Sequence, residues 1–427
     1  MAVRHQAPRG TRDLLPADTA RWRWAEERAR EVLERYAYGE IRIPMFEDFE
    51  LFARTSGESS DVVQKEMYRF KDLGDRDLAL RPEFTAGVMR AYLEHGLGGR
   101  ARVHRLWSGG PVFRYGRPQK GRWRQFSQIN CELIGSPAPG ADVEVITLFV
   151  DLYQAWGFKD LTVLVNSVGQ PASRRAYGEA LRAWLTPARD RLSADSQKRL
   201  ETNPLRVLDT KDEGDHALLK ELGTMPRLLD SIDAEDRAHW DQVLAGLGAA
   251  GIRHEIDHGL VRGLDYYTRT AFEVHDRTLG AQSALGGGGR YDGLIEMLGG
   301  PPTPGVGFAI GLDRVLMMLE ERGLDTGTAD TVCVVAMDAT RDAATALVRE
   351  LRREFPVEHD VETRGFNAQM KAAGKSGARF LVIVGEEEWG RGEVALKDAT
   401  RGTQETLSRA ALFDALRARM TRSEERP

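Results

Sequence analysis

The feature that most restricts the folds open to this chain is the shortness of its apolar segments. The longest unbroken apolar run, Val332 to Met337, has six residues, whereas a helix needs roughly 20 to cross a bilayer. The chain nevertheless has 427 residues, of which 41% are hydrophobic, enough for a sizeable core. The sequence therefore predicts a soluble protein of two or three domains, built from short strands and amphipathic helices, without a membrane span.

The first three quarters of the chain carry strand-like and helix-like patterns in turn. Short apolar runs alternate with charged turns from Leu78 to Glu132 and again from Val261 to Ile310, which is typical of an antiparallel sheet. Residues from about Ser173 to Arg253 instead show helical spacing of Ala, Leu, Arg and Glu. We therefore expect an α+β domain over residues 1–325 with a helical insertion at about 173–253.

Two further elements are expected near the N-terminus. An amphipathic helix is predicted from Ala20 to Tyr36, and the alternating run Ile41 to Ile43 reads as a strand. Pro44 marks the end of that strand because proline cannot donate a ladder hydrogen bond.

The C-terminal quarter has a different pattern, separated by the linker-like segment Gly323 to Asp330. Strands are predicted at Val332 to Ala336, Val357 to Val361 and Phe380 to Val384, and helices at Arg341 to Phe355 and Asn367 to Lys375. Strands alternating with helices at this spacing indicate a separate small α/β domain, residues 331–427, with a largely parallel sheet.

Charge and cysteine content exclude several classes of protein. The chain has 60 Lys and Arg against 65 Asp and Glu, a net charge of −5, which argues against indiscriminate coating of DNA but leaves room for a local RNA-binding strip. Its two cysteines, Cys131 and Cys333, supply neither a disulfide framework nor a four-ligand zinc site, so both are expected to be reduced. Residues Met1 to Gly10 lack the apolar core of a secretory signal, which favours the cytoplasm.

The densest group of functional side chains runs from Phe113 to Gln128. Cations, amides and aromatic rings there surround one proline and two glycines, a composition suited to holding a polyphosphate and stacking on a base. A solvated basic hairpin explains the same residues equally well.

Four other segments carry candidate site residues, each with a structural alternative. The run from Leu260 to Thr270 reads as a strand with Arg262 and Tyr266 on one face and Tyr267 on the other, or as an ordinary half-buried strand. Glu83 precedes a helix-like segment, where it is either a binding group or a helix cap. The glycines of Ala284 to Gly293 lack the ending of a P-loop. Gly305 to Val315 reads as a strand that enters a helix, with Arg314 in the first turn.

In this order along one chain, these segments resemble the histidyl-tRNA synthetases, which are class II aminoacyl-tRNA synthetases. The resemblance covers nearly the whole sequence. The segments that carry it are Arg9 to Leu14, the region ending at Pro44, Phe113 to Glu132, Asn203 to Asp209, Val261 to Phe272, Leu285 to Gly293 and Gly305 to Arg314. It implies a class II antiparallel-sheet catalytic domain with a helical insertion, followed by an α/β anticodon-binding domain.

The resemblance implies an ATP-dependent, AMP-forming histidine-tRNA ligase. Such an enzyme activates histidine to histidyl-adenylate and transfers it to the 3′ end of tRNA(His). It implies a homodimer, with Mg²⁺ accompanying ATP, and we see no dedicated metal site in the sequence.

Individual roles follow from matching positions in the family. Arg114 and Arg262 match the residues that stabilise the transferring phosphoryl group. The positions matched to ATP are Arg114, Arg122, Phe126 and Arg314. Those matched to histidine are Glu83, Thr85, Gln128, Glu132, Arg262, Tyr266 and Tyr267. The expected contacts with the tRNA acceptor end are Arg117, Gln119, Lys120 and Arg124.

Two positions depart from the family pattern. Gly116 stands two residues after Arg114, where an acidic residue is usual, and Phe84 stands after Glu83, where glycine is common.

The alternative to an active ligase is a catalytically silent paralogue, either a regulatory subunit of ATP phosphoribosyltransferase or a histidine or RNA sensor.

Overall fold

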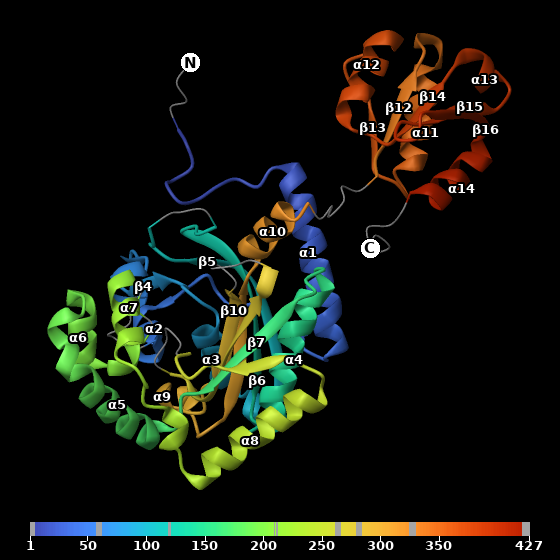
Figure 1. Cartoon of the computed structure of the whole chain (residues 1–427). Coiled ribbons are helices and arrows are strands. Elements are labelled where there is room, and N and C mark those ends of the chain that lie inside the picture. The colour runs from blue at the N-terminus through green and yellow to red at the C-terminus, as the bar shows by residue number, and fades with distance from the viewer. Residues whose placement is uncertain are drawn as a thin grey trace. The chain divides into compact units, whose positions relative to one another are not determined.

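The computed structural model describes residues 5–56, 62–117, 121–208, 210, 212–260, 266–278, 284–323 and 330–420. These residues form two compact units (Figure 1). The first holds residues 5–13 and 25–323, and the second holds Leu14–Trp24 and residues 330–420. Because residues 324–329 lie outside the described part, the domain boundary near 325–331 stays a prediction.

An eight-stranded sheet forms the centre of the first unit (Figure 1). In spatial order its strands are β1 (Gly39–Glu40), β5 (His104–Phe113), β6 (Gln125–Ile134), β11 (Gly305–Gly311), β10 (Ala284–Arg290), β9 (Thr268–Asp276), β7 (Leu161–Ser167) and β8 (His254–Ile256). The ladders from β5 to β7 are antiparallel, and only the two edge strands pair in parallel. The predicted antiparallel sheet is therefore confirmed.

The strand expected at Ile41 to Ile43 is wrong in its position. The strand ends at Glu40, although the Ile41 N–H still donates to the Trp107 carbonyl of β5 at 2.8 Å, and a side chain holds the backbone further on. The guanidinium of Arg81 donates to the carbonyl oxygens of Ile43, at 2.9 Å, and Pro44, at 3.2 Å. Arg81 therefore takes the place of a ladder partner only at Ile43 and Pro44.

The glycines of β10 and β11 let three strands approach one another closely. Gly307 pairs with Glu132 across the β11–β6 ladder, and Gly288 lies on the opposite neighbour, β10. A Cβ atom at Gly288 would collide with the Gly307 carbonyl, and one at Gly307 would collide with the Glu132 carboxylate. The glycine-rich motif thus fixes the spacing of strands beneath a site.

Helices cover the sheet and support its ends. On one face, α4 (Pro139–Ala155) contacts β6, β9 and β11, with α8 (Ala234–Ala249) beside it. The Phe149 ring of α4 lies 4.5 Å from that of Phe308 and 5.8 Å from that of Phe272, measured between centroids. The other elements of this part include the residues of α1 (Pro16–Arg35) from Ala25 on, α2 (Phe49–Ser56), the π-helix η1 (Val62–Glu66), α3 (Thr85–Glu94), α9 (Leu294–Met297), α10 (Leu312–Glu321) and a three-stranded sheet of β2 (Phe46–Asp48), β4 (Asp77–Leu80) and β3 (Arg69–Lys71).

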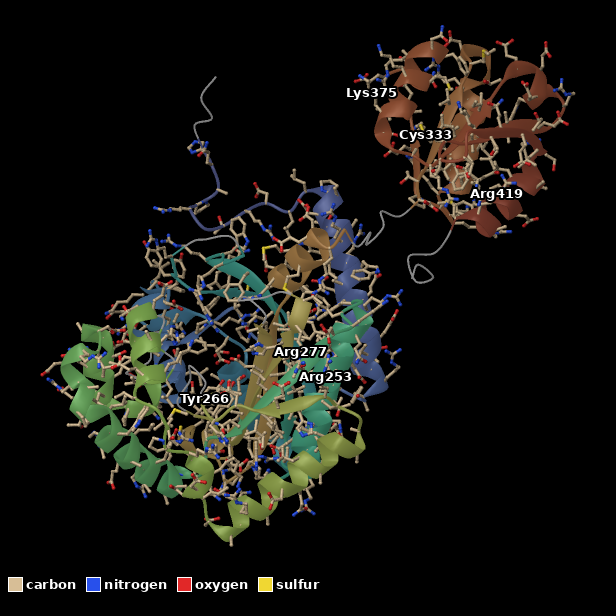
Figure 2. The ribbon with its side chains drawn as sticks, in the orientation of Figure 1. Arg253, Tyr266, Arg277, Cys333, Lys375 and Arg419 are labelled. Carbon is tan, nitrogen blue, oxygen red and sulfur yellow. The ribbon has the colours of Figure 1, made fainter. Side chains whose placement is uncertain are left out.

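The helices expected in the insertion are present between β7 and β8. They are α5 (Pro171–Leu185), α6 (Ala194–Thr202), α7 (Glu213–Glu221) and α8. Leu185, Leu200 and Leu218 belong to a small core of their own. Two arginines labelled in Figure 2 bind β7 at the end where the chain re-enters the sheet: Arg253 Nε donates to the Leu161 carbonyl at 2.9 Å, and Arg277 Nε donates to Thr162 Oγ1 at 2.8 Å.

The second unit is a five-stranded sheet with helices. Its strand order is β13 (Val357–His359), β12 (Val332–Ala336), β14 (Phe380–Val384), β15 (Glu393–Asp398) and β16 (Thr403–Ser408), with helices α11 (Arg341–Leu351), α12 (Phe366–Ser376), α13 (Glu386–Gly390) and α14 (Arg409–Arg419). The first three strands are parallel, as predicted, but β15 and β16 are antiparallel. The short connection between these last two strands allows only an antiparallel pair, which corrects the largely parallel sheet.

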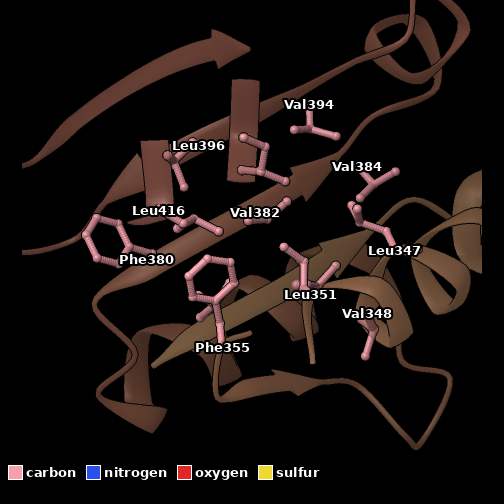
Figure 3. Packing of buried hydrophobic residues seen from close by; sticks show 14 of the residues in the cluster. Leu347, Val348, Leu351, Phe355, Phe380, Val382, Val384, Val394, Leu396 and Leu416 are labelled. Carbon is pink, nitrogen blue, oxygen red and sulfur yellow. The ribbon is translucent and has the colours of Figure 1, made fainter. Parts of the chain in front are cut away.

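The core of this second unit is formed by α11, α14 and the sheet. Figure 3 shows Leu347, Leu351 and Phe355 against Val382 and Leu416. Cys333 lies in β12 and Cys131 in β6, and both are buried and free, as expected. Among the described residues, no helix combines the length and the apolar character needed to cross a membrane.

Candidate active site

Two cavities in the first unit share Arg114 and Val62 in their walls. The larger, about 340 Å³, is lined by Val62, Glu66, Arg114, Gly116, Gly121, Arg122, Trp123, Phe126, Arg199, Arg206, Gly311, Asp313 and Arg314. The smaller, about 230 Å³, is lined by Val62, Glu83, Thr85, Arg114, Gln128, Asn130, Tyr266, Tyr267, Gly286, Gly287, Tyr291, Gly307, Phe308 and Ala309. We call them the cationic cavity and the tyrosine cavity.

Arg114 lies where the two cavities meet, directly after the last residue of β5. Its Nε donates to the Pro82 carbonyl at 2.8 Å, which fixes the direction of the side chain. Burial lowers the pKa of Arg114, while the charges of Glu66 and Glu83 act in the opposite direction. The guanidinium is thus a positioned cation that faces both hollows.

The cationic cavity brings together every described residue that the sequence assigned to ATP. Phe126 comes from β6 and Arg314 from the first turn of α10, and Arg122 precedes β6. The Arg114 guanidinium carbon lies 5.6 Å from the centre of the Phe126 ring. An aromatic ring among several guanidinium groups can stack on a base and bind a polyphosphate.

An N-terminal segment supports the wall of the cationic cavity. Arg12 Nη2 binds Asp313 Oδ1 at 2.9 Å, and the Ser127 backbone N–H donates to Asp313 Oδ2 at 2.7 Å. The Arg12 guanidinium also lies over the Trp123 ring, 4.8 Å from its centre. Asp313 therefore ties residues before α1 to β6 and α10.

The tyrosine cavity contains most of the residues assigned to histidine. The Glu83 carboxylate accepts hydrogen bonds from the backbone N–H groups of Thr85, at 2.5 Å, and Ala86, at 2.9 Å. Burial raises the pKa of Glu83, and these hydrogen bonds oppose the rise. Glu83 is thus both a helix cap for α3 and a wall residue of the cavity, so the two interpretations of it are compatible.

One polar atom in this cavity has no partner among the described residues. Gln128 is 7% exposed, and its Oε1 atom is buried without a hydrogen bond. A buried, unpaired acceptor costs free energy until a donor reaches it. A ligand with an N–H group directed at Gln128 would satisfy it.

Glu132 lies behind the cavity wall instead of lining it. It is 1% exposed and accepts hydrogen bonds from Asn130 Nδ2, at 2.7 Å, and from the hydroxyl group of Tyr291. Burial raises its pKa to about 8, against the effect of its hydrogen bonds. Glu132 therefore reaches the cavity through Asn130 and Tyr291, which both line it.

Tyr266 and Tyr267 precede β9 and are not part of a strand, so the opposite faces predicted for them are wrong. Both line the tyrosine cavity, with ring centres 4.7 Å apart. Tyr266, labelled in Figure 2, is buried, which raises its pKa well above the usual value. Arg174 of α5 donates to the Tyr267 carbonyl. The helical insertion thus helps to position the two tyrosines.

Several predicted residues lie outside the described part of the chain or away from the cavities. Arg262, Gln119 and Lys120 are not described. Arg117 is exposed, whereas the Arg124 guanidinium stacks on Tyr115 at 3.7 Å from the ring centre. The acceptor-end contacts therefore stay predictions.

Sequence reasoning missed several wall residues: Tyr291, Asn130, Glu66, Asp313, Arg199 and Arg206. Alternation along β6 could have found Asn130, because it shares a face with Gln128 and Glu132. Nothing in the sequence around Glu66, or in the insertion helices that supply Arg199, indicated a cavity.

Comparisons with known proteins agree with this geometry. The histidyl-tRNA synthetase family model matches residues 10–315, and an anticodon-binding domain model matches residues 331–419. The chain belongs to the histidyl-tRNA synthetase family. Within this family, it is 48% identical over 401 residues to the histidine-tRNA ligase of Thermosynechococcus vestitus, with 93% of each chain covered. It is also 48% identical to that of Synechococcus sp. strain JA-3-3Ab, covering 96% of this chain and 98% of the relative.

Solved structures place the fold in the same family. The apo histidyl-tRNA synthetase of S. aureus matches with a TM-score of 0.79 and 39% identity, covering 96% of this chain and 99% of that one. A Bacillus halodurans structure described as an ATP phosphoribosyltransferase regulatory subunit/histidyl-tRNA synthetase matches at 22% identity, with a TM-score of 0.65, which shows the fold alone. The matched anticodon-binding domain and the ligase relatives do not favour the regulatory alternative.

Proposed function

We propose that this chain activates histidine with ATP and transfers it to the 3′ end of tRNA(His), as a histidine-tRNA ligase. The observation that carries the proposal is the shared position of Arg114 between two cavities with different linings. The cationic cavity suits a nucleoside triphosphate, and the tyrosine cavity suits a small polar molecule with several hydrogen-bonding groups. A reaction that joins their occupants takes place beside Arg114.

The chemistry requires a carboxylate to attack a phosphorus atom that is itself negatively charged. Histidine in the tyrosine cavity would direct its carboxylate toward Arg114, and ATP in the cationic cavity would place its α-phosphate on the other side. Arg114 would hold the developing negative charge, and no protein nucleophile is needed. The second catalytic residue of the proposal, Arg262, acts on the same phosphoryl group.

We assign the adenine of ATP to the space between Phe126 and Arg314, and its triphosphate to Arg122 and Arg114. Mg²⁺ would enter with ATP as part of the substrate, bound chiefly by phosphate oxygens. The described residues include no group of three or more His, Cys, Asp or Glu side chains able to hold a metal ion.

We assign the α-ammonium group of histidine to Glu83, Thr85 and Gln128. The unpaired Oε1 atom of Gln128 supports this role, because an ammonium group is a donor only. The imidazole ring would then meet Tyr266 and Tyr267, with Glu132 reaching it beside Tyr291. A substrate without two ring nitrogens would leave buried polar groups unpaired, which gives specificity.

The proposal extends to assembly and to tRNA. We propose a catalytic domain over residues 1–325 and an anticodon-binding domain over 331–427 in a cytoplasmic homodimer. The acceptor end of the tRNA would meet the segment from Arg117 to Arg124.

Met45 and Phe46, next to Pro44, are 51% and 54% exposed. Such apolar side chains on the surface are consistent with a two-fold interface there.

Histidine-dependent exchange of labelled pyrophosphate into ATP, without tRNA, tests the activation step. We expect exchange with histidine and not with the other amino acids. Arg114→Ala should reduce it about 100-fold, the effect of losing one donor to a developing charge. Arg76→Ala, which removes an exposed arginine paired with Asp72, is the matched control. Absence of histidine-dependent exchange in the wild-type protein would refute the proposed function.

A further inference from the structure

We propose that Glu66 selects ATP among nucleoside triphosphates, by accepting a hydrogen bond from the exocyclic amino group of adenine. This inference rests on the proposed function, since it assigns the nucleotide to the cationic cavity. Glu66 has no role in the reaction described above. It is an acidic residue in a cavity whose charged lining residues are mostly arginines.

Two carboxylates belong to the described lining of the cationic cavity, Glu66 and Asp313. Both oxygens of Asp313 are already hydrogen-bonded, one to Arg12 and the other to the Ser127 backbone. No described residue donates a hydrogen bond to the Glu66 carboxylate. Of the two, Glu66 is therefore the acceptor available to a ligand.

The position of Glu66 is fixed by the backbone beside Gly116. The Tyr115 backbone N–H donates to the Glu66 carbonyl at 2.6 Å, and the Tyr68 and Tyr115 rings meet edge to face at 5.5 Å between centroids. A Cβ atom at Gly116 would lie 3.5 Å from Glu66 Oε1. The carboxylate thus occupies the space that a longer side chain at position 116 would fill.

Glu66 is close enough to Arg114 for its charge to act on the guanidinium, but it borders only one of the two cavities. Glu66 lines only the cationic cavity, whereas Arg114 lines both. The carboxylate lies beside Gly116, and Phe126 and Arg314, between which we place the adenine, line the same cavity. A carboxylate there would repel the phosphate groups but accept a hydrogen bond from a base.

The chemistry of the purines makes such a carboxylate selective. Adenine carries an amino group, a donor, at the six position, whereas guanine carries a carbonyl oxygen, an acceptor. An ionised carboxylate accepts only. ATP would therefore gain a charged hydrogen bond that GTP replaces with repulsion between two acceptors.

Calorimetric titration measures nucleotide binding to the full-length protein, with ATP, GTP and purine riboside triphosphate, which lacks the amino group. The wild type should bind ATP about tenfold or more tightly than purine riboside triphosphate, as expected for one hydrogen bond to a charged group. Glu66→Ala should bind these two equally and should lose most of the discrimination against GTP. Gln64→Ala, an exposed position of the same π-helix, is the control and should match the wild type.

A second variant separates base recognition from a general loss of structure. In the double variant Glu66→Ala/Gly116→Glu, a carboxylate returns from the neighbouring backbone position, where a Cβ meets only ordinary contacts. It should restore at least part of the preference for ATP. Equal weakening of all three nucleotides in Glu66→Ala, without rescue, would overturn the inference and assign Glu66 to the charge balance of Arg114.

The two proposals fail in distinguishable ways. If the wild-type protein prefers ATP through Glu66 but shows no histidine-dependent exchange, the proposed function is wrong and the inference survives. If exchange occurs and Glu66→Ala keeps the wild-type preference for ATP, the inference is wrong alone.

Discussion

The ion pair between Arg290 and Asp142 gives the sharpest test of how this fold supports its site. Arg290 is the last residue of β10 and Asp142 lies in the first turn of α4. Both side chains are fully buried. Arg290 Nε lies 3.1 Å from each oxygen of Asp142, and Nη1 donates to the Ser136 carbonyl at 2.9 Å and to Asp292 Oδ1 at 3.0 Å. We expect Arg290→Met to leave a buried carboxylate without its arginine partner, with only His239 Nε2 remaining, 3.3 Å from Asp142 Oδ2.

The magnitude follows from the pKa of Asp142. Burial alone raises this pKa, but the charge of Arg290 and the hydrogen bonds outweigh it and lower the value from 3.8 to about 2. A difference of about two pKa units corresponds to roughly 2 to 3 kcal/mol of stabilisation near neutral pH. Without Arg290 most of this is lost, because only the contact with His239 remains, and burial becomes a penalty. We therefore expect the variant to lose about 3–5 kcal/mol.

Urea denaturation at pH 7, followed by tryptophan fluorescence, measures this loss. Five of the eight tryptophans (Trp107, Trp123, Trp156, Trp184 and Trp240) lie in the first unit, so the signal reports mainly on that unit. Arg191→Met, which removes an exposed ion pair with Glu221, is the matched control and should shift the transition little.

A double-mutant cycle identifies the pair as the cause. Arg290→Met/Asp142→Leu removes both charges and should be at least about 2 kcal/mol more stable than the sum of the single losses predicts. Additive losses, or an Arg290→Met loss below about 1 kcal/mol, would refute the reasoning. The stabilisation from Asp142 is complete above pH 3.8 and is lost as the pH falls toward 2, because its folded-state pKa is the lower one.

Three other outcomes follow from the site and its surroundings. The raised pKa of Glu132, about 8 against 4.5, means that its contribution to stability is complete below pH 4.5 and is lost as the pH rises toward 8. Between pH 5 and 9 the melting temperature of Glu132→Gln should therefore fall less steeply than that of the wild type. Parallel curves for the two proteins would show that Glu132 does not cause the pH dependence. Gly307→Ala should lower the free energy of unfolding by about 1–3 kcal/mol in the same urea assay, because the new methyl group meets Glu132 and the Cys131 carbonyl. An unchanged free energy would show that β6 and β11 can move apart to make room for the methyl group. Met45→Asp should convert the proposed dimer to a monomer in light scattering after gel filtration, and an unchanged mass would place the interface elsewhere.

Most of the elements could be predicted from local patterns. The antiparallel sheet, the insertion helices and the strands at Val332 and Phe380 all follow from periodicity in the sequence, which reports the burial of one face. Errors occurred where a distant side chain replaces a regular partner. The backbone at Ile43 and Pro44 is held by Arg81 instead of a ladder, and no pattern near Pro44 contains that information.

The candidate site shows the same division. Resemblance to the family supplied Arg114, Phe126, Gln128, Tyr266 and Tyr267, and the structure brings them to the two cavities. Glu66 could not be found in this way, because its role depends on lying beside Gly116, 50 positions later in the chain. Proximity of that kind is a property of tertiary packing.

By itself the sequence determined the family, the division into two units and the identity of the groups able to react. Apolar periodicity and turn residues act over a few positions, so they are readable without the fold. Only the tertiary structure decided that Arg114 faces both cavities, that Glu132 lies behind Tyr291, and that Arg290 is a buried structural residue. These properties depend on burial and on charges that come together from distant segments, and desolvation makes each of them effective only inside the folded protein.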